Sequence, residues 1–166
     1  MNSSNRCKLH VFCDVYVTIS DYKNITYVHM RYYDGKYPTK KGVAMPLLRW
    51  KTLVQLIPKI QENRNADQSA FEHLGGNCYI SITDDIPGID IRDFWMPEGE
   101  LKIKATKRGV HFSQEDFDKL VDLIPRINGY IPEFDEIKLY VENDDHQNQQ
   151  GALRCKECNP NEYHMW

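Results

Sequence analysis

An internal repeat is the sequence feature that most constrains the fold of this chain. Three landmarks of the first half recur 67 residues later in the same order: a basic residue before Gly-Val, an aromatic residue, and Leu-Ile-Pro. They are Lys41-Gly42-Val43 and Arg108-Gly109-Val110, Trp50 and Phe117, and Leu56-Ile57-Pro58 and Leu123-Ile124-Pro125. Self-similarity at a fixed spacing indicates repeated structural units. The chain of 166 residues is therefore expected to hold two small units of the same design.

The second copy has the clearer strand pattern, within residues 89–127. Ile91 and Arg92 alternate in polarity, and so do residues 101–106 after the turn Pro97-Glu98-Gly99. Neighbouring side chains of a strand point to opposite faces, so this alternation predicts a hairpin with one apolar and one basic face. A basic turn at Lys107-Arg108-Gly109 and a short strand should follow.

An amphipathic helix is predicted at the end of each copy. In the second copy Ser113 offers an N-cap before an apolar stripe, and in the first copy Pro46 suits the start of the helix. Apolar side chains at helical spacing form the two stripes: Trp50, Leu53, Val54 and Ile57, and Phe117, Leu120, Val121 and Ile124. Each stripe should cover one face of its sheet and leave the basic face open to a polyanion.

The strands of the first copy are read from alternation on both sides of two turns. The first turn is Asp21-Tyr22-Lys23-Asn24, and the second contains Asp34-Gly35, a strong turn dipeptide between strands. These patterns give a first repeat at 11–62, a polar linker at 63–76, a second repeat at 77–129 and an acidic C-terminal extension at 130–166. Residues 1–10 are expected to be frayed, and an added strand is expected within 134–142.

Residues 78–128 resemble a known family in the order of their residues rather than in composition. The sequence IDIRDFWMPEGELK, the Lys-Arg-Gly turn and the helix ending in Leu-Ile-Pro are similar to the single-stranded-DNA-binding domain of the transcriptional coactivator called positive cofactor four. That family has a curved four-stranded antiparallel sheet followed by one helix, and it pairs into dimers. The first copy resembles the same domain with weaker motifs. The resemblance implies an α+β fold of two tandem units that form an intramolecular pseudo-dimer; a higher oligomer stays open.

Charge is distributed unevenly along the chain, although its net value is only −3. Residues 14–62 carry a net charge of +4, residues 77–129 carry −3, and residues 130–166 carry −5. A basic front half and an acidic rear are expected when one surface meets an anion. The first repeat should therefore attract a nucleic acid more strongly than the second.

The candidate nucleic-acid-binding residues are cations in both copies and two aromatic residues. Phosphate binding needs several cations along a groove, and unpaired bases stack on aromatic rings. The residues are Tyr22, Lys23, Arg31, Lys36, Lys40, Lys41, Arg92, Trp95, Lys102, Lys104, Lys107 and Arg108. The resemblance places Tyr22 and Trp95 as stacking aromatics, whereas Phe94 is expected to pack. Neither copy keeps the whole pattern, because Asp34 stands where the second copy has Trp95, and this favours one composite site.

Binding of single-stranded or melted DNA is the function that the resemblance implies, in transcription, replication or repair, without catalysis and without a cofactor. An intracellular protein is expected, in the nucleus rather than the cytoplasm. Two alternatives stay open. One is a protein-interaction module of the same fold that docks a polymerase or a transcription factor, and the other is binding of single-stranded RNA in the same groove.

The five cysteines show no disulfide framework, and a reducing compartment suits them. Cys155 and Cys158 with His164 offer three of the four ligands of a structural zinc site, but we expect an unliganded tail there. No catalytic motif appears, and no apolar run approaches the length of a membrane span. We therefore expect no metal, no enzyme activity and no membrane partner.

Overall fold

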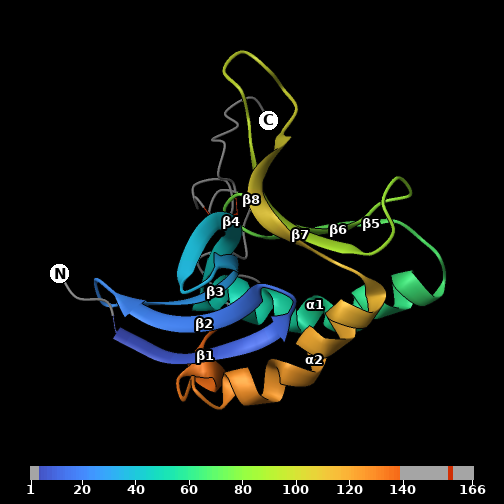
Figure 1. Ribbon diagram of the computed structural model, residues 1–166. Helices are drawn as coiled ribbons and strands as arrows, with labels where there is room; N and C mark the ends of the chain where they lie inside the picture. The colour runs from blue at the N-terminus through green and yellow to red at the C-terminus, as the bar shows by residue number, and fades with distance from the viewer. Residues whose placement is uncertain (1–3, 139–156, 159–166) are drawn as a thin grey trace.

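Two four-stranded antiparallel sheets, each followed by one helix, form the computed structural model, which describes residues 4–138 and 157–158 (Figure 1). The first unit consists of β1 (Ser4–Phe12), β2 (Val15–Tyr22), β3 (Ile25–Asp34), β4 (Tyr37–Pro46) and α1 (Leu47–Asn65). The second consists of β5 (Ala70–Gly75), β6 (Cys78–Ile82), β7 (Ile89–Trp95), β8 (Lys104–Phe112) and α2 (Gln114–Asn128). We call the sheets A and B; their strands follow the chain order. The expected α+β fold of two similar units is confirmed.

The turns that the sequence predicts in the first unit are present. Lys23 and Asn24 have φ angles of 51° and 65° and join β2 to β3, while Gly35 has φ of 60° between β3 and β4. Two successive positive φ values twist a hairpin in the sense of its strands, and Asn and Gly tolerate them well. The register of sheet A thereby places Val17 opposite Met30 and Thr18 opposite His29.

The core is built from the apolar face of each sheet and the apolar stripe of each helix. In sheet A, Val17, Ile19, Val28 and Met30 have no exposed surface. The buried residues of the helices keep the 67-residue spacing: Trp50, Leu53, Ile57 and Ile60 in α1, and Phe117, Leu120, Ile124 and Ile127 in α2. The Ser113 hydroxyl accepts a hydrogen bond from the backbone N–H of Asp116, so the expected N-cap of α2 is also present.

Each helix packs against the edge strand of the other unit's sheet as well as against its own sheet. Helix α1 packs against β5 of the second sheet, and α2 packs against β1 of the first, where Figure 1 shows it running along the sheet. The Phe12 and Phe112 rings lie 5.4 Å apart, and the Trp50 indole N–H donates to Asn128 Oδ1 at 2.8 Å. One continuous core therefore joins both units within one chain.

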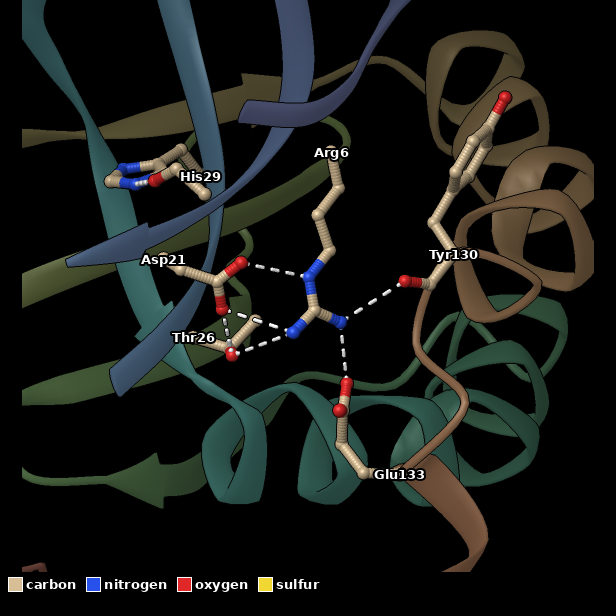
Figure 2. A network of polar contacts seen from close by, with 7 residues as sticks. Arg6, Asp21, Thr26, His29, Tyr130 and Glu133 are labelled. Carbon is tan, nitrogen blue, oxygen red and sulfur yellow. Dashed lines mark hydrogen bonds and ion pairs between the residues drawn. The ribbon is translucent and has the colours of Figure 1, made fainter. Parts of the chain in front are cut away.

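Arg6 ties the first sheet to the segment after α2 through five hydrogen bonds (Figure 2). Its Nε and Nη2 donate to the Asp21 carboxylate at 2.9 and 3.0 Å, and Nη1 donates to Glu133 at 2.6 Å. The remaining acceptors are the Thr26 hydroxyl and the Tyr130 carbonyl. These hydrogen bonds lower the pKa of Asp21. Arg6 therefore links the first sheet to the segment that follows α2.

Several element boundaries differ from the expectations. The N-terminal segment expected to be frayed forms β1 from Ser4, because Leu9 and Val11 enter the core. The segment 63–76, expected to be a linker, contains β5 and the Gly75-Gly76 turn into β6. Helix α1 continues past Pro58 to Asn65, since Ile60 is buried one turn later. In 134–142, the described residues contain a 3-10 turn at Phe134–Glu136, and residues 139–142 lie outside the described part.

The basic segments expected as turns lie inside strands. Lys40 and Lys41 belong to β4, and Lys107 and Arg108 belong to β8. The hairpin also differs, because β8 begins only at Lys104 and the preceding loop projects from the body (Figure 1). Leu101 in that loop is 78% exposed, so the apolar face predicted for residues 101–106 is not buried.

Candidate nucleic-acid interface

The same strand irregularity occurs in both units and explains why the basic segments resembled turns. In sheet A, Arg31 pairs with Gly42 but Tyr33 pairs with Pro38, so three residues of β4 oppose one residue of β3. Sheet B repeats this shift, with Arg92 opposite Gly109 and Phe94 opposite Ala105. Such a bulge bends a strand and re-aims its side chains.

Hydrogen bonds hold the two bulges in the same way. The Thr39 hydroxyl donates to the Tyr32 carbonyl at 2.7 Å, and the Thr106 hydroxyl donates to the Asp93 carbonyl at 2.7 Å. Arg31 Nη1 donates to the Thr39 carbonyl at 3.1 Å, and Arg92 Nη1 donates to the Thr106 carbonyl at 2.8 Å. Each arginine is thus fixed by one edge of its guanidinium to a bulge.

One row of side chains across the outer face is identical in both sheets. It reads His, Tyr, Arg and Gly along the paired strands: His10, Tyr16, Arg31 and Gly42 in sheet A, and His73, Tyr79, Arg92 and Gly109 in sheet B. The histidine contacts agree as well, since Nε2 lies 2.7 Å from the Cys13 carbonyl or from the Gly76 carbonyl. The repeat therefore extends to a row of exposed-face residues that sequence spacing alone did not reveal.

The adjacent row is where the two faces differ. In sheet A it reads Lys8, Thr18, His29 and Ala44, and in sheet B it reads Phe71, Ser81, Asp90 and His111. A cation and a neutral imidazole in the first unit thus correspond to an aromatic ring and a carboxylate in the second. This substitution gives the two outer faces different charge.

The outer face of sheet A contains a hollow of about 700 Å³. Small side chains lie on its floor, including Thr18, Ser20 and Ala44, while longer ones from all four strands surround them. Four cationic residues line it: Lys8, Arg31, Lys36 and Lys40. Tyrosines line it too: Tyr22, Tyr27 and Tyr33. None of the described residues that line it is Asp or Glu, so the hollow can accept an anion without expelling a carboxylate.

Charge and aromatic surface lie close together around this hollow. Lys8 Nζ lies 4.2 Å from the centroid of the Tyr33 ring and 4.7 Å from that of Tyr16. Lys23 Nζ lies 5.3 Å from the Tyr22 centroid. Burial lowers the pKa of Arg31, and burial together with the charge of Arg31 lowers the pKa of His29. The lining of the hollow therefore combines a partly desolvated cation with a neutral imidazole, and both would be stabilised in charged form by a bound anion.

On the outer face of sheet B, the charge of the arginine is offset by a neighbouring carboxylate, and aromatic rings pack beside this pair. Asp90 accepts hydrogen bonds from Arg92 Nε and Nη2 at 2.9 and 3.0 Å, which raise the pKa of Arg92. Beside this pair, the Phe71 and Tyr79 rings stack at 4.8 Å, and Phe94 meets both edge-on. This face offers a self-paired arginine and an aromatic cluster.

The candidate residues of the first copy gather around the hollow. Tyr22, Arg31, Lys36 and Lys40 line it, and Lys23 lies beside Tyr22 in the adjoining turn. Lys41 is exposed on β4 next to Lys40 but does not line the hollow.

The candidate residues of the second copy are more dispersed. Arg92 forms an ion pair with Asp90. The Lys104 Nζ atom lies 3.2 Å from Glu100 Oε2, and the Arg108 Nε atom lies 3.8 Å from Asp93 Oδ2. Lys102 and Lys107 are exposed, in the projecting loop and in β8 respectively. Trp95 is 50% exposed at the end of β7. Strand alternation places it on the face opposite Phe94, which packs as expected.

Several residues of the hollow were missed in the sequence. They are Asn5, Lys8, Thr18, Ser20, Tyr27, His29 and Tyr33. The alternation of β3 did carry a signal, because His29, Arg31 and Tyr33 share one face opposite Val28 and Met30. Lys8 was not recognised as a candidate, because residues 1–10 were expected to be frayed and they contain most of β1.

Metal binding and membrane insertion receive no support from the described residues. Within 4–138 and 157–158, no group of three or more His, Cys, Asp or Glu residues is arranged to hold a metal ion. Cys155 and His164 lie outside that range. Among the helices of the same residues, none is long and apolar enough to cross a bilayer.

Comparison with known families identifies part of the first unit. Residues 14–56 match the family model described as Transcriptional Coactivator p15 (PC4). No curated protein and no solved structure matches the chain. The match falls on the copy with the weaker sequence motifs, and it covers β2, β3, β4 and the first half of α1. The first unit is thus similar to this coactivator family, and the second unit has the same sheet-and-helix architecture.

Proposed function

We propose that this chain binds single-stranded nucleic acid, melted DNA above all, in the hollow of sheet A. The observation that carries the proposal is the lining of that hollow by four cations and several tyrosines, with no Asp or Glu among its described residues. Cations along a groove bind phosphates by releasing counterions, and exposed rings stack on unpaired bases. The match of residues 14–56 to a transcriptional coactivator family favours the same activity and a role in transcription, and hence in the nucleus.

A preference for single strands follows from the form of the site. Bases in a duplex are stacked on each other and paired, so their faces cannot reach rings such as Tyr22 and Tyr27 in a concave sheet. The cations Lys8, Arg31 and Lys40, which line the hollow, can meanwhile contact the backbone of one strand. Catalysis is no part of this proposal, since stacking and ion pairing provide binding alone.

The second unit supports a different candidate function, the docking of a protein partner. Its exposed large apolar side chains are Phe71, Ile86, Trp95 and Leu101, from 50% to 78% exposed. Aromatic side chains such as Phe71 and Trp95 are enriched at protein–protein interfaces. A polymerase or transcription factor held there would bring the first unit to melted DNA.

The proposal is tested by fluorescence anisotropy with a labelled thymidine oligomer, a duplex of the same length and a uridine RNA. We expect the single strand to bind more tightly than the duplex at every salt concentration, with a log–log slope of about −0.7 per phosphate contacted. Lys36→Ala with Lys40→Ala should weaken binding. Lys119→Ala on α2, which removes a cation beside Asp116 and away from the hollow, is the matched control.

Two outcomes would count against this function. Equal affinity for duplex and single strand would refute the stacking mechanism. Absence of binding at low salt would favour the docking module, and tighter binding of RNA than of DNA would make RNA the ligand.

A further inference from the structure

The second unit contains an internal anion whose position indicates where a phosphate lies in the first. Arg92 uses Nη1 to hold the bulge carbonyl of Thr106, and its Nε and Nη2 bind both oxygens of Asp90. A carboxylate bound to that edge of a guanidinium has the two-oxygen geometry that a phosphate also presents. Asp90 therefore stands in for the phosphate oxygens of a nucleic-acid backbone.

The first unit has the same arginine without the carboxylate. Arg31 uses Nη1 to hold the bulge carbonyl of Thr39, and His29 occupies the position that Asp90 has in the second unit. Among the described residues, no hydrogen bond or ion pair engages Nε or Nη2 of Arg31. The edge that carries an internal anion in one unit is thus available to an external one in the other.

We propose that His29 and Arg31 form a phosphate subsite in the hollow, and that His29 takes up a proton when a phosphate binds there. This inference rests on the proposed function, and it assigns to His29 a role in binding that Arg31 alone does not fulfil. The ligand is a phosphodiester of the bound strand, and a free tetrahedral oxyanion shares its chemistry.

The surroundings of His29 favour a neutral imidazole before binding and a charged one afterwards. His29, labelled in Figure 2, has its Nε2 2.9 Å from the Ser20 hydroxyl on β2. Its ring centroid lies 6.0 Å from that of Tyr27. The charged groups lining the same hollow are Lys8, Lys36 and Lys40, together with Arg31 itself. Asp93 of the second unit acts on Arg31 from a distance and is not among the lining residues. All cations oppose protonation of His29 until an anion offsets them.

Proton uptake makes the affinity depend on pH in a defined direction. Since burial and Arg31 lower the pKa of free His29, and a phosphate raises it, the complex binds one more proton than the free protein at pH values between the two. Affinity therefore increases as the pH falls, by at most about tenfold per pH unit for one proton.

The test measures binding of a thymidine oligomer by the full chain between pH 7.5 and 5.5, because thymine does not titrate in that range. The wild-type affinity should increase about three- to thirtyfold over this interval. His29→Gln should lose the increase in affinity at low pH, so that it shows a flat profile and binds more weakly than the wild type at pH 5.5. His10→Gln, which removes a histidine that does not line the hollow, should keep the wild-type profile.

Two further variants exchange the residues that distinguish the units. His29→Asp should weaken binding at every pH by about tenfold or more, since the new carboxylate would pair with Arg31 as Asp90 pairs with Arg92. Asp90→Asn should strengthen binding up to a few-fold by releasing Arg92. An unchanged affinity in His29→Asp would overturn the subsite.

A second measurement separates this inference from the proposed function. The ring proton signals of His29, identified by their loss in His29→Gln, are titrated by nuclear magnetic resonance in sodium chloride, in sodium sulfate of equal ionic strength, and with the oligomer. A raised pKa with both anions supports a subsite for any tetrahedral oxyanion, and a raised pKa with the oligomer alone supports a phosphodiester subsite. An unmoved pKa, or a wild-type pH slope in His29→Gln, would refute the inference while strand binding stands. If the oligomer does not bind at any pH, the proposed function fails, and the sulfate titration still decides the subsite.

Discussion

The two units of this chain have the same architecture but different outer faces. Both fix an arginine to a bulge and flank it with the same His, Tyr and Gly row. One row away, Lys8 and His29 in the first unit correspond to Phe71 and Asp90 in the second. The structural parts of the repeat have therefore been kept, while the residues that determine charge have diverged. The arginine of the common framework is an internal ion-pair partner in the second unit, whereas its neighbour in the first unit is His29 and not a carboxylate.

The largest expected difference between the units concerns their bulge glycines. A Cβ on Gly42 would lie 2.3 Å from the Met30 carbonyl oxygen, whereas the nearest atoms to a Cβ on Gly109 belong to the side chain of Arg92, at 2.7 Å. The Met30 carbonyl belongs to a paired strand and cannot move aside, whereas the Arg92 side chain can shift if it gives up part of its hydrogen bonding to Asp90 and Thr106. Gly42→Ala should lower the free energy of unfolding by about 3 kcal/mol and Gly109→Ala by about 1 kcal/mol. Urea unfolding measures both, and equal losses would show that the bulges are not packed as described.

Removing an aromatic ring should weaken nucleic-acid binding more in the first unit than in the second. Tyr22 lines the hollow, while Trp95 lies at the end of β7 on the face opposite Phe94. Tyr22→Ala should weaken binding of a thymidine oligomer by about 1–3 kcal/mol, and Trp95→Ala by about 1 kcal/mol if one strand reaches both units. Because stacking releases few ions, the salt slope should stay unchanged. A larger effect at Trp95 would place the main site on the second unit.

The basic pairs next to the bulge glycines provide a test by charge. Lys40→Ala with Lys41→Ala should reduce affinity about tenfold near 0.1 M salt and flatten the salt slope by about 1.4, the value for two phosphates. Lys107→Ala with Arg108→Ala should reduce it about threefold, since Arg108 already lies 3.8 Å from Asp93 and its unit carries net negative charge. The reverse order would mean that local geometry outweighs the net charge of each unit.

The smallest effect is expected at the contact between the units. Arg6→Ala should lower the free energy of unfolding at pH 7 by less than about 1 kcal/mol, because Arg6 and Asp21 are partly exposed and solvent screens them. The pKa of Asp21 is lowered in the folded protein, so its stabilising contribution is complete above the unfolded pKa of about 4 and is lost as the pH falls through the folded value. Unfolding at pH 7 and pH 3 should therefore show a smaller difference between variant and wild type at pH 3.

Much of the fold was predictable from the sequence because its signals are local. The helix stripes around Trp50 and Phe117, the Ser113 cap and the Asp34-Gly35 turn depend on neighbours in the chain. Strands β1 and β5 were missed, since their burial depends on helices that come from the other unit. The site was predicted in part for the same reason: Arg31 and Lys40 were found by motif, whereas Lys8 and the pairing of Arg92 with Asp90 depend on register across strands.

The exchange of helices between the sheets has a consequence for how the protein is made. Strand β1 leaves the ribosome before the other described elements, but the helix that packs along it, α2, ends only at Asn128. The β1 edge of sheet A therefore stays exposed to solvent until synthesis of the chain has passed Asn128. Contacts between such distant parts of a chain slow folding, and uncovered edges invite pairing with other chains. Because α2 lies on the same chain as β1, the covering of β1 does not depend on the concentration of a second chain.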